Sequence, residues 1–261
     1  MGLSHRIRRI VEISKRMTDF QSRVNYFRLR YQISRKAGTS ADRALLPMQV
    51  RELDGHTIVC RCHSTDILVF DDTFKSLYHL PPEGLQIHRI LDLGSNIGLT
   101  LAHYATIFPT AQLCGVELDA GNLEICRMNC ASFSDRCKLL HAAVWNECGS
   151  VSYGGETEWG FSITPDRSKS QSGAKSVDAI TISKILDANG WDEVDFVKMD
   201  IEGAEEKVFS DGSSWEKRVK CIKVEIHPPY TVQACIKDLE NMGFLCHQDS
   251  SHWACVIAMR A

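Results

Sequence analysis

The sequence predicts an α/β fold in which a doubly wound, mostly parallel sheet follows a basic helical extension. Strand-like and helix-like patterns alternate from residue 88 onwards, as they do in such sheets. A turn that contains Gly94 and Gly98 directly follows the first of these strands. The last pattern, over residues 244–259, is typical of an antiparallel hairpin added to the edge of the sheet.

Residues 1–43 are expected to form the extension, and residues 44–261 the main domain. The extension holds eleven Lys and Arg side chains and three acidic ones, so its net charge is +8, whereas the main domain carries −11. Residues 3–36 contain no Gly or Pro, and apolar residues recur there at helical spacing. We therefore expect one or two amphipathic helices with a basic outer face, followed by a linker over residues 36–47.

The remaining elements follow from hydrophobic periodicity. Residues 48–70 alternate around the turn signal Asp54-Gly55, which predicts a hairpin. The later strands are expected at residues 89–94, 111–118, 137–144, 194–200 and 219–226. The helices are expected at residues 97–108, 120–131, 203–212 and 230–243. Residues 145–176 are rich in Gly, Ser and charge and show no helical period, which predicts an irregular loop with a function.

Composition favours a cytoplasmic globular protein. No apolar run approaches the ~20 residues of a membrane span, and the first residues lack the apolar segment of a secretory signal. The eleven cysteines are scattered without a C-x-x-C pair, which predicts reduced thiols. The basic extension is expected to pack on the main domain or to join copies in a homo-oligomer. An anionic membrane surface also fits it, whereas nucleic acid fits poorly because no nucleic-acid motif accompanies the charge.

The stretch RILDLGSNIGLT, residues 89–100, is the first candidate for a ligand site, because ligands bind beyond the carboxyl ends of the strands in open α/β sheets. It lacks one glycine of the dinucleotide fingerprint G-x-G-x-x-G, and Asp92 inside the strand would repel a pyrophosphate. Glu117 and Asp119 end the next strand, roughly 20 residues later, where an acid can accept both hydroxyls of an adenosine ribose. The cationic cofactor S-adenosylmethionine therefore fits better than NAD.

Charged side chains at the ends of two later strands form the second candidate. In DFVKMDIE, Lys198, Asp200 and Glu202 project to one side of the strand. In IKVEIH, Glu225 and His227 share a face. Buried parallel strands are normally apolar on both faces, so these charges are costly unless they are paired or functional. The pattern is consistent with an ion-pair group centred on Lys198 and with a site that receives the acceptor substrate.

The stretches ILDLGSNIGLT, VKMDIEGAEEKVF and IKVEIH together resemble the FkbM-type family of S-adenosylmethionine-dependent O-methyltransferases, from about Met48 to the C-terminus. The resemblance implies the class I methyltransferase fold, which is Rossmann-like with a terminal antiparallel hairpin. It also implies methyl transfer to a hydroxyl of a small molecule, such as a sugar or a glycosylated or polyketide natural product. The donor-binding residues that it carries over are Asp92, Gly94, Asn96, Gly98 and Glu117.

Two further residues join this donor set from the bottom-up analysis. Backbone N–H groups from Ser95 onwards can hold the carboxylate of the methyl donor, and Asp119 stands beside Glu117 at the end of the second strand. The family often has Ala where Ser95 stands.

The chemistry requires a group that takes up a proton. An alcohol is a poor nucleophile near neutral pH, so methyl transfer to oxygen needs alignment of the reactants and a general base. His227, oriented by Glu225, is one candidate for the base, and Asp200 is another. A divalent ion held by Asp200 and Glu225 would instead acidify the hydroxyl. We favour a base without a metal, with Lys198 and Glu202 completing the catalytic group.

Two other classes of function stay open at this point. The basic extension is consistent with methylation of RNA or protein, and a methyltransferase shell can serve as a non-catalytic binding protein. Intact acids at the predicted site argue against the latter: Asp92, Glu117, Asp200 and Glu202.

The irregular stretch carries an expectation of its own. Residues 154–175 leave the sheet at its ligand-binding edge, so we expect a lid over the acceptor. Trp159 and Phe161 are its expected contact residues.

Overall fold

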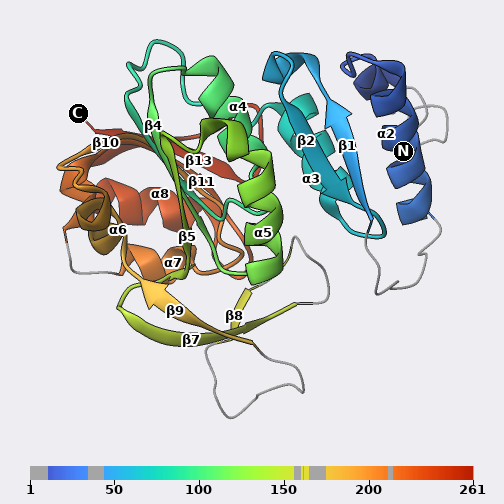
Figure 1. Cartoon of the computed structure of the whole chain (residues 1–261). Helices are drawn as coiled ribbons and strands as arrows, with labels where there is room; N and C mark the ends of the chain where they lie inside the picture. The colour runs from blue at the N-terminus through green and yellow to red at the C-terminus, as the bar shows by residue number, and fades with distance from the viewer. Residues whose placement is uncertain are drawn as a thin grey trace.

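A computed structural model describes residues 11–34, 44–155, 160, 162–164, 175–210 and 214–260. Within these residues the centre of the fold is a seven-stranded sheet with the strand order β12-β13-β11-β10-β3-β4-β5 (Figure 1). Five of its strands run parallel: β3 (Arg89–Leu93), β4 (Gln112–Glu117), β5 (Cys137–His141), β10 (Val194–Met199) and β11 (Val219–Glu225). The other two strands, β12 (Phe244–Gln248) and β13 (Cys255–Arg260), pair antiparallel at the edge. The predicted doubly wound sheet with a terminal hairpin is confirmed.

Helices cover both faces of this sheet because its strands are apolar on both sides. In Figure 1, α4 (Leu99–Ile107) and α5 (Ala120–Asn129) lie on one face, and α6 (Ile182–Asn189), α7 (Glu205–Phe209) and α8 (Val232–Asn241) lie on the other. Adjacent residues of one strand enter opposite layers: Ile90 belongs to the core cluster of α4, and Leu91 belongs to that of α6. The carboxyl ends of the parallel strands are therefore left as the edge at which a ligand site can form.

The hairpin signal at Asp54-Gly55 is confirmed. Strands β1 (Leu45–Gln49) and β2 (Thr57–Arg61) pair antiparallel, and Asp54 and Gly55 both adopt left-handed backbone angles between them. Two details of the sequence interpretation are wrong. The strand β1 begins inside the expected linker, and α3 (Asp66–Asp71) is a helix where alternation was expected. Tertiary contacts decide the second point, because the Asp66 carboxylate accepts the Arg61 backbone N–H and pairs with its guanidinium.

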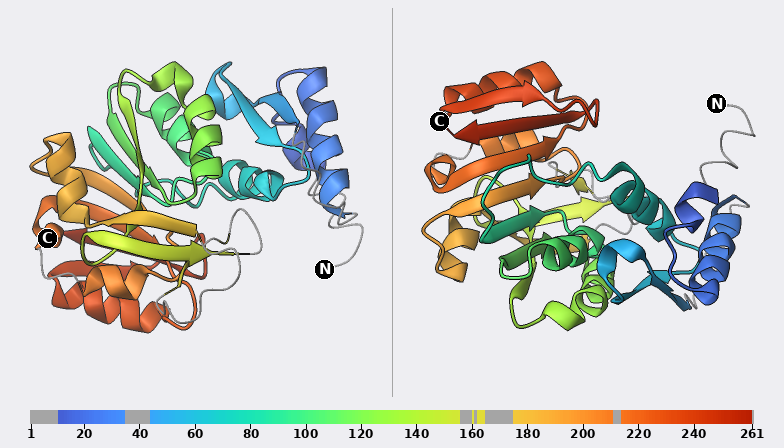
Figure 2. Two further views of the ribbon diagram at one scale, coloured as in Figure 1. Left: turned by 60° about the horizontal axis from the view of Figure 1, so that its bottom comes forward. Right: turned by 90° about the horizontal axis from the view of Figure 1, so that it is seen from above.

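The described part of the extension packs on this hairpin. Helix α2 (Phe20–Ser34) lies on the outer side of β1 (Figures 1 and 2). Its Tyr26 hydroxyl and Arg30 guanidinium both donate to the carboxylate of Asp71 at the end of α3. The hairpin is bonded in turn to the central domain, since the amide of Asn129 bonds the backbone of Val59 and of Ile97. The domain boundary expected after residue 43 falls in a stretch outside the described residues.

The stretch expected to be irregular, residues 145–176, contains β7, β8 and the start of β9 of a second, four-stranded sheet, so that prediction is wrong in part. Its strands, in the order β6-β9-β7-β8, are β6 (Ala143–Val144), β9 (Lys175–Ile180), β7 (Gly149–Gly154) and β8 (Ser162–Thr164). Tyr153 and Val177 turn inward from β7 and β9 and form a small core with Ala143. Pairing with distant segments supplies the stability that local sequence does not show. Trp159 and Phe161, the expected lid contacts, lie outside the described residues.

The eleven cysteines are free thiols, nine of them buried. Among the described helices, none combines the length and the apolar character needed to cross a membrane.

Candidate active site

A cavity of about 420 Å³ opens at the carboxyl ends of the parallel strands. One end is bounded by the glycine turn after β3 and by Glu117 at the end of β4. The other end is bounded by acidic and basic side chains that follow β10 and β11. Segments from outside the sheet complete the wall, because Tyr78 and Thr73 reach it from the N-terminal part and Ile163 from β8. Both predicted candidates therefore belong to one site.

The glycine turn and Glu117 are locked together. Asn96 has a positive φ of 49°, and its backbone N–H donates to Glu117 Oε2 at 2.8 Å. The other carboxylate oxygen, Oε1, accepts the Asp119 backbone N–H, also at 2.8 Å. Burial raises the pKa of Glu117 to about 7. The side chain of Asn122 is a further hydrogen-bond partner, so the carboxylate is held in a fixed orientation on the cavity wall.

The two glycines of the turn are required by protein packing. Gly94 has φ +81°, and a Cβ added there would lie 1.8 Å from the carbonyl oxygen of Asp200 on the neighbouring strand. Gly98 has φ +80°, and its added Cβ would lie 2.7 Å from Cys126 Sγ. The carbonyl oxygen of Asp200 therefore occupies the space beside Gly94. Gly94 still borders the cavity through its backbone.

Three other residues of the predicted donor set lie in different positions. Asp92 is fully buried beneath the wall, where it accepts a hydrogen bond from Thr100 and lies 3.5 Å from Lys198 Nζ. Asp119 caps α5 and pairs with Lys175 at 2.5 Å. Ser95 borders the cavity and donates its hydroxyl to the Asp92 carbonyl oxygen. Direct donor contacts by Asp92 and Asp119 stay predictions that this placement does not favour.

Lys198 is the cationic centre of the opposite end. Its side chain is only 4% exposed, and its Nζ lies 3.5 Å from Asp92, 3.3 Å from Asp200 and 3.4 Å from the Gly94 carbonyl oxygen. Burial opposes the charged form, but the carboxylates of Asp200 and Asp92 raise the pKa of Lys198 above its ordinary value. The expected ion-pair group around Lys198 thus exists, and it connects the glycine turn to the acidic end.

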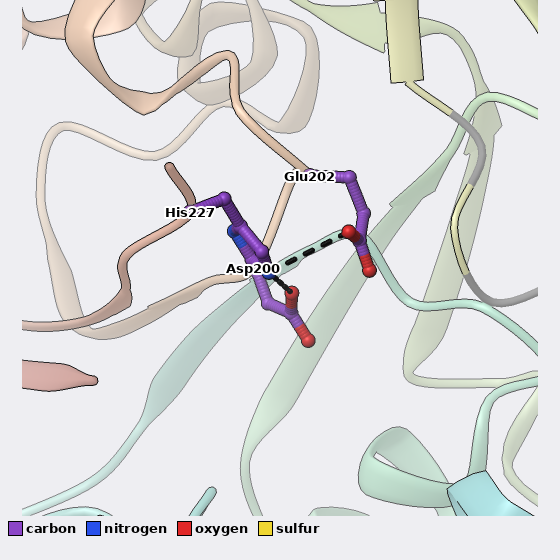
Figure 3. A group of neighbouring side chains, drawn as sticks. All are labelled: Asp200, Glu202 and His227. Carbon is purple, nitrogen blue, oxygen red and sulfur yellow. Dashed lines mark ion pairs between the residues drawn. The ribbon is translucent and has the colours of Figure 1, made fainter. Parts of the chain in front are cut away.

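His227 lies among the carboxylates of Asp200, Glu202 and Glu205. Figure 3 shows the first two beside its imidazole ring. Its Nε2 is 3.5 Å from Glu202 and 3.7 Å from Asp200. Its Nδ1 lies 2.9 Å from Glu205, a fully buried residue at the start of α7. Glu205 therefore orients the imidazole, which corrects the expectation that Glu225 does so. Residue spacing could not reveal this contact, because Glu205 and His227 approach each other from different strand ends.

The charge states at this end follow from burial and from neighbours. Burial and the charge of Asp200 raise the pKa of Glu202 and that of Glu225 to about 7. Burial alone would lower the pKa of His227, but the hydrogen bond to Glu205 and the charge of Asp200 raise it to about 9. At neutral pH His227 is therefore mostly a cation, which donates protons. The groups whose pKa suits proton uptake near pH 7 are the two glutamates.

The family model "Methyltransferase FkbM domain" matches residues 92–247, which hold both ends of the cavity. The chain belongs to the FkbM methyltransferase family. It is also similar to the 2-O-methyltransferase NoeI of Sinorhizobium fredii (strain NBRC 101917 / NGR234), with 25% identity over 172 residues, covering 56% of this chain and 70% of that protein. The resemblance found in the sequence is confirmed.

Solved structures are similar at lower identity. A precorrin-6y C5,15-methyltransferase from Geobacter metallireducens is 12% identical, with a TM-score of 0.42, over 71% of this chain and 84% of that chain. A putative caffeoyl-CoA O-methyltransferase from Staphylococcus aureus is 11% identical, with a TM-score of 0.40, over 90% of this chain and 92% of that chain. The class I methyltransferase fold of this FkbM protein is shown by its own strand order.

S-adenosylmethionine is the methyl donor of the FkbM family, and the residues present fit it. The cavity wall carries one lysine and five acidic residues: Asp72, Glu117, Asp200, Glu202 and Glu225. This excess of acid suits a sulfonium with an ammonium group and opposes a pyrophosphate. The fixed carboxylate of Glu117 ends the second strand of the sheet, where the ribose hydroxyls of adenosine cofactors are bound.

The acidic end also has the spacing of a metal site. Asp200, Glu202 and His227 each offer one ligand atom, and these atoms lie within 4.8 Å of one another. Carboxylate oxygens with an imidazole suit a divalent cation, and Glu205 would hold the ring of His227 as a second partner. This set differs from the expected pair, Asp200 with Glu225. Tyr78, whose hydroxyl lies 3.4 Å from Asp200, was missed in the sequence because it stands outside any motif.

Proposed function

We propose that the chain is an O-methyltransferase that acts on a hydroxyl of a small acceptor, such as a sugar unit of a glycoside. One observation carries the proposal: a single cavity joins the donor-type turn and Glu117 to a group of carboxylates around His227. The relative NoeI, whose name describes a 2-O-methyltransferase, supports transfer to oxygen. A proton-accepting end suits an alcohol, which is a poor nucleophile until its proton is taken up.

The mechanism uses this chain's own residues at three points. The bound donor supplies an electrophilic methyl group on a sulfonium. Glu117 and the backbone of the turn fix the donor, so that the acceptor oxygen can approach the methyl carbon in line. As the oxygen–carbon bond forms and the sulfur–carbon bond breaks, the hydroxyl proton passes to Glu202 or Glu225. Lys198 and His227 lie beside Asp200, and Asp200 orients the hydroxyl of the acceptor.

The test is a transfer assay with S-adenosylmethionine labelled in its methyl group. The chain is incubated with a panel of glycosides and other polyhydroxylated molecules, and with RNA and protein as competing acceptor classes. We expect label in a methyl ether on a small acceptor. Label confined to RNA or protein, or to nitrogen, contradicts the proposal, as does a chain that binds the donor product and methylates none of these classes.

A chelator arm of the same assay tests the base mechanism. We expect turnover to survive EDTA. Loss of turnover that Mg²⁺ or Mn²⁺ restores would show that the ligand set Asp200, Glu202 and His227 works through a bound ion.

The pH dependence of kcat follows from the shifted groups. At saturating donor, kcat is expected to rise with pH through about 7, because the raised pKa keeps Glu202 and Glu225 protonated below that value. It is expected to fall again above about 9, where His227 loses the proton that makes it a cation. Initial rates measured from about pH 5 to about pH 10 cover both the rise and the fall of kcat. A Glu202→Gln, Glu225→Gln double variant that keeps the lower limb would show that another group is the base.

A further inference from the structure

The outer face of helix α2 is apolar and exposed. Phe20, Val24, Phe27 and Tyr31 are 79%, 41%, 43% and 56% exposed. Their spacing of four, three and four residues places them in one stripe along the helix. A large apolar stripe on a soluble surface marks a contact with a membrane or with another protein.

The helix does not need this stripe for its own attachment. The inner side of α2 is held by hydrogen bonds: the amide of Asn25 donates to the Pro47 carbonyl oxygen, and the hydroxyl of Ser22 accepts the Gln49 N–H. Tyr26 and Arg30 donate to Asp71, as described above. Buried Tyr26 and Leu29 complete this inner side, so α2 carries apolar side chains on both of its faces. The Phe27 ring contacts the Tyr26 ring edge-on but is still 43% exposed, and apolar surface left in water is unfavourable.

Charge decides which partner fits the stripe. Arg23 and Arg28 are exposed and lie on either side of it, each about 70° around the helix axis. The extension as a whole carries +8. A second copy of the chain would bring these arginines against each other in a face-to-face dimer, which repulsion disfavours. A surface of phosphate groups would instead pair with both arginines.

We propose that α2 docks on an anionic phospholipid surface, with Phe20, Phe27 and Tyr31 entering the headgroup region and Arg23 and Arg28 pairing with lipid phosphates. The position of the helix permits this, because α2 lies at the outer edge of the molecule, on the side of β1 that faces away from the central sheet (Figures 1 and 2). The contact is a peripheral one, since no described helix is apolar enough to span a bilayer.

Docking on a membrane would act on the part of the chain that borders the active site. Asp71, which both α2 donors bind, directly precedes Asp72 and Thr73 on the cavity wall. A lipid-bound α2 is thus connected through Asp71 to this part of the cavity wall.

Vesicle co-sedimentation of the full chain tests the proposal. The vesicles consist of phosphatidylcholine alone or of phosphatidylcholine mixed with phosphatidylglycerol. We expect binding to the mixed vesicles, weakened by salt, and at least about tenfold weaker binding to the neutral ones. Phe20→Ser with Phe27→Ser, and separately Arg23→Gln with Arg28→Gln, are each expected to lower binding by at least about tenfold.

The matched control is Leu245→Ser, which removes an apolar side chain that is 67% exposed on β12, at the far edge of the central sheet. It is expected to bind vesicles as the unchanged chain does. Circular dichroism and binding of S-adenosylhomocysteine establish that every variant is folded.

Equal binding of all variants, or no preference for the anionic vesicles, overturns the proposal. So does a dimer in solution that the phenylalanine substitutions dissociate while vesicles bind nothing, because the stripe would then serve a second copy. Vesicle binding is measured without turnover, so failure of the proposed methyl transfer would not alter this result.

Discussion

Replacing Asp200 by Asn is expected to lower kcat by about 10²-fold or more, because Asp200 orients the hydroxyl that attacks the methyl carbon. Asp200 is the carboxylate that Lys198, Tyr78 and His227 all face, at 3.3, 3.4 and 3.7 Å. Asn keeps the shape and removes the charge, so the two cations lose the acid between them. The dissociation constant for S-adenosylhomocysteine is expected to change by less than about threefold, because Asp200 lies at the acceptor end.

His227→Ala should behave in the same way, since it removes the cation that faces Asp200 and Glu202. Glu206→Gln is the matched control, because Glu206 is an exposed acid one residue away from buried Glu205 on α7. Steady-state rates give the change in kcat, and calorimetry on the same preparations gives the change in the dissociation constant for S-adenosylhomocysteine. Asp200→Asn with normal turnover would remove Asp200 from the mechanism, and a variant that no longer binds the donor product would place it in the donor site.

Glu117→Ala is expected to weaken the binding of S-adenosylhomocysteine by about 100-fold or more. Two hydrogen bonds from ribose hydroxyls to a buried carboxylate contribute about 1.5–3 kcal/mol each, and about 1.4 kcal/mol corresponds to tenfold. The substitution also frees the backbone N–H groups of Asn96 and Asp119, so the turn loses its fixed geometry. Calorimetry measures the change.

Glu124→Ala controls for this substitution, because Glu124 is an exposed acid on α5, close to Glu117 in the chain. Thermal unfolding of both variants shows whether lost affinity reflects lost structure. An unchanged affinity in Glu117→Ala would place the ribose elsewhere. Tight binding of NAD to the unchanged chain would contradict the choice of donor.

The raised pKa of Glu117 predicts a pH dependence of donor-product binding, which the same calorimetry measures. Donor-product affinity should rise with pH through about 7, since only the ionised carboxylate accepts two hydroxyl donors. In the Glu117→Ala variant this pH dependence should disappear.

Local pattern was enough to predict much of this molecule. The alternation of strands and helices from residue 88, the turn around Gly94 and the acid Glu117 are properties of short stretches, and each is found where it was expected. The family followed from three such stretches and is confirmed over residues 92–247. Periodicity and turn chemistry report these features because they act between residues that are close in the chain.

Elements that depend on pairing between distant segments were not predicted from the sequence. Strands β7, β8 and β9 were missed because their stability comes from pairing with one another and from a shared core. That core consists of Ala143, Tyr153 and Val177. Helix α3 was missed for a related reason, since Arg61 on β2 holds its first residue, Asp66. In both cases, tertiary contacts outweigh local propensity.

The sequence by itself determined which chemical groups the active site has: the acids, the lysine, the histidine and the glycine turn at the ends of successive strands. Only the tertiary structure decided how they are used. It buried Asp92 under the wall, made Glu205 the partner of His227, brought Tyr78 to Asp200 and left Phe20 and Tyr31 of α2 exposed. The physical reason is that charge states and partners depend on distances of about 3–4 Å between side chains from different elements, and residue spacing along the chain does not specify those distances.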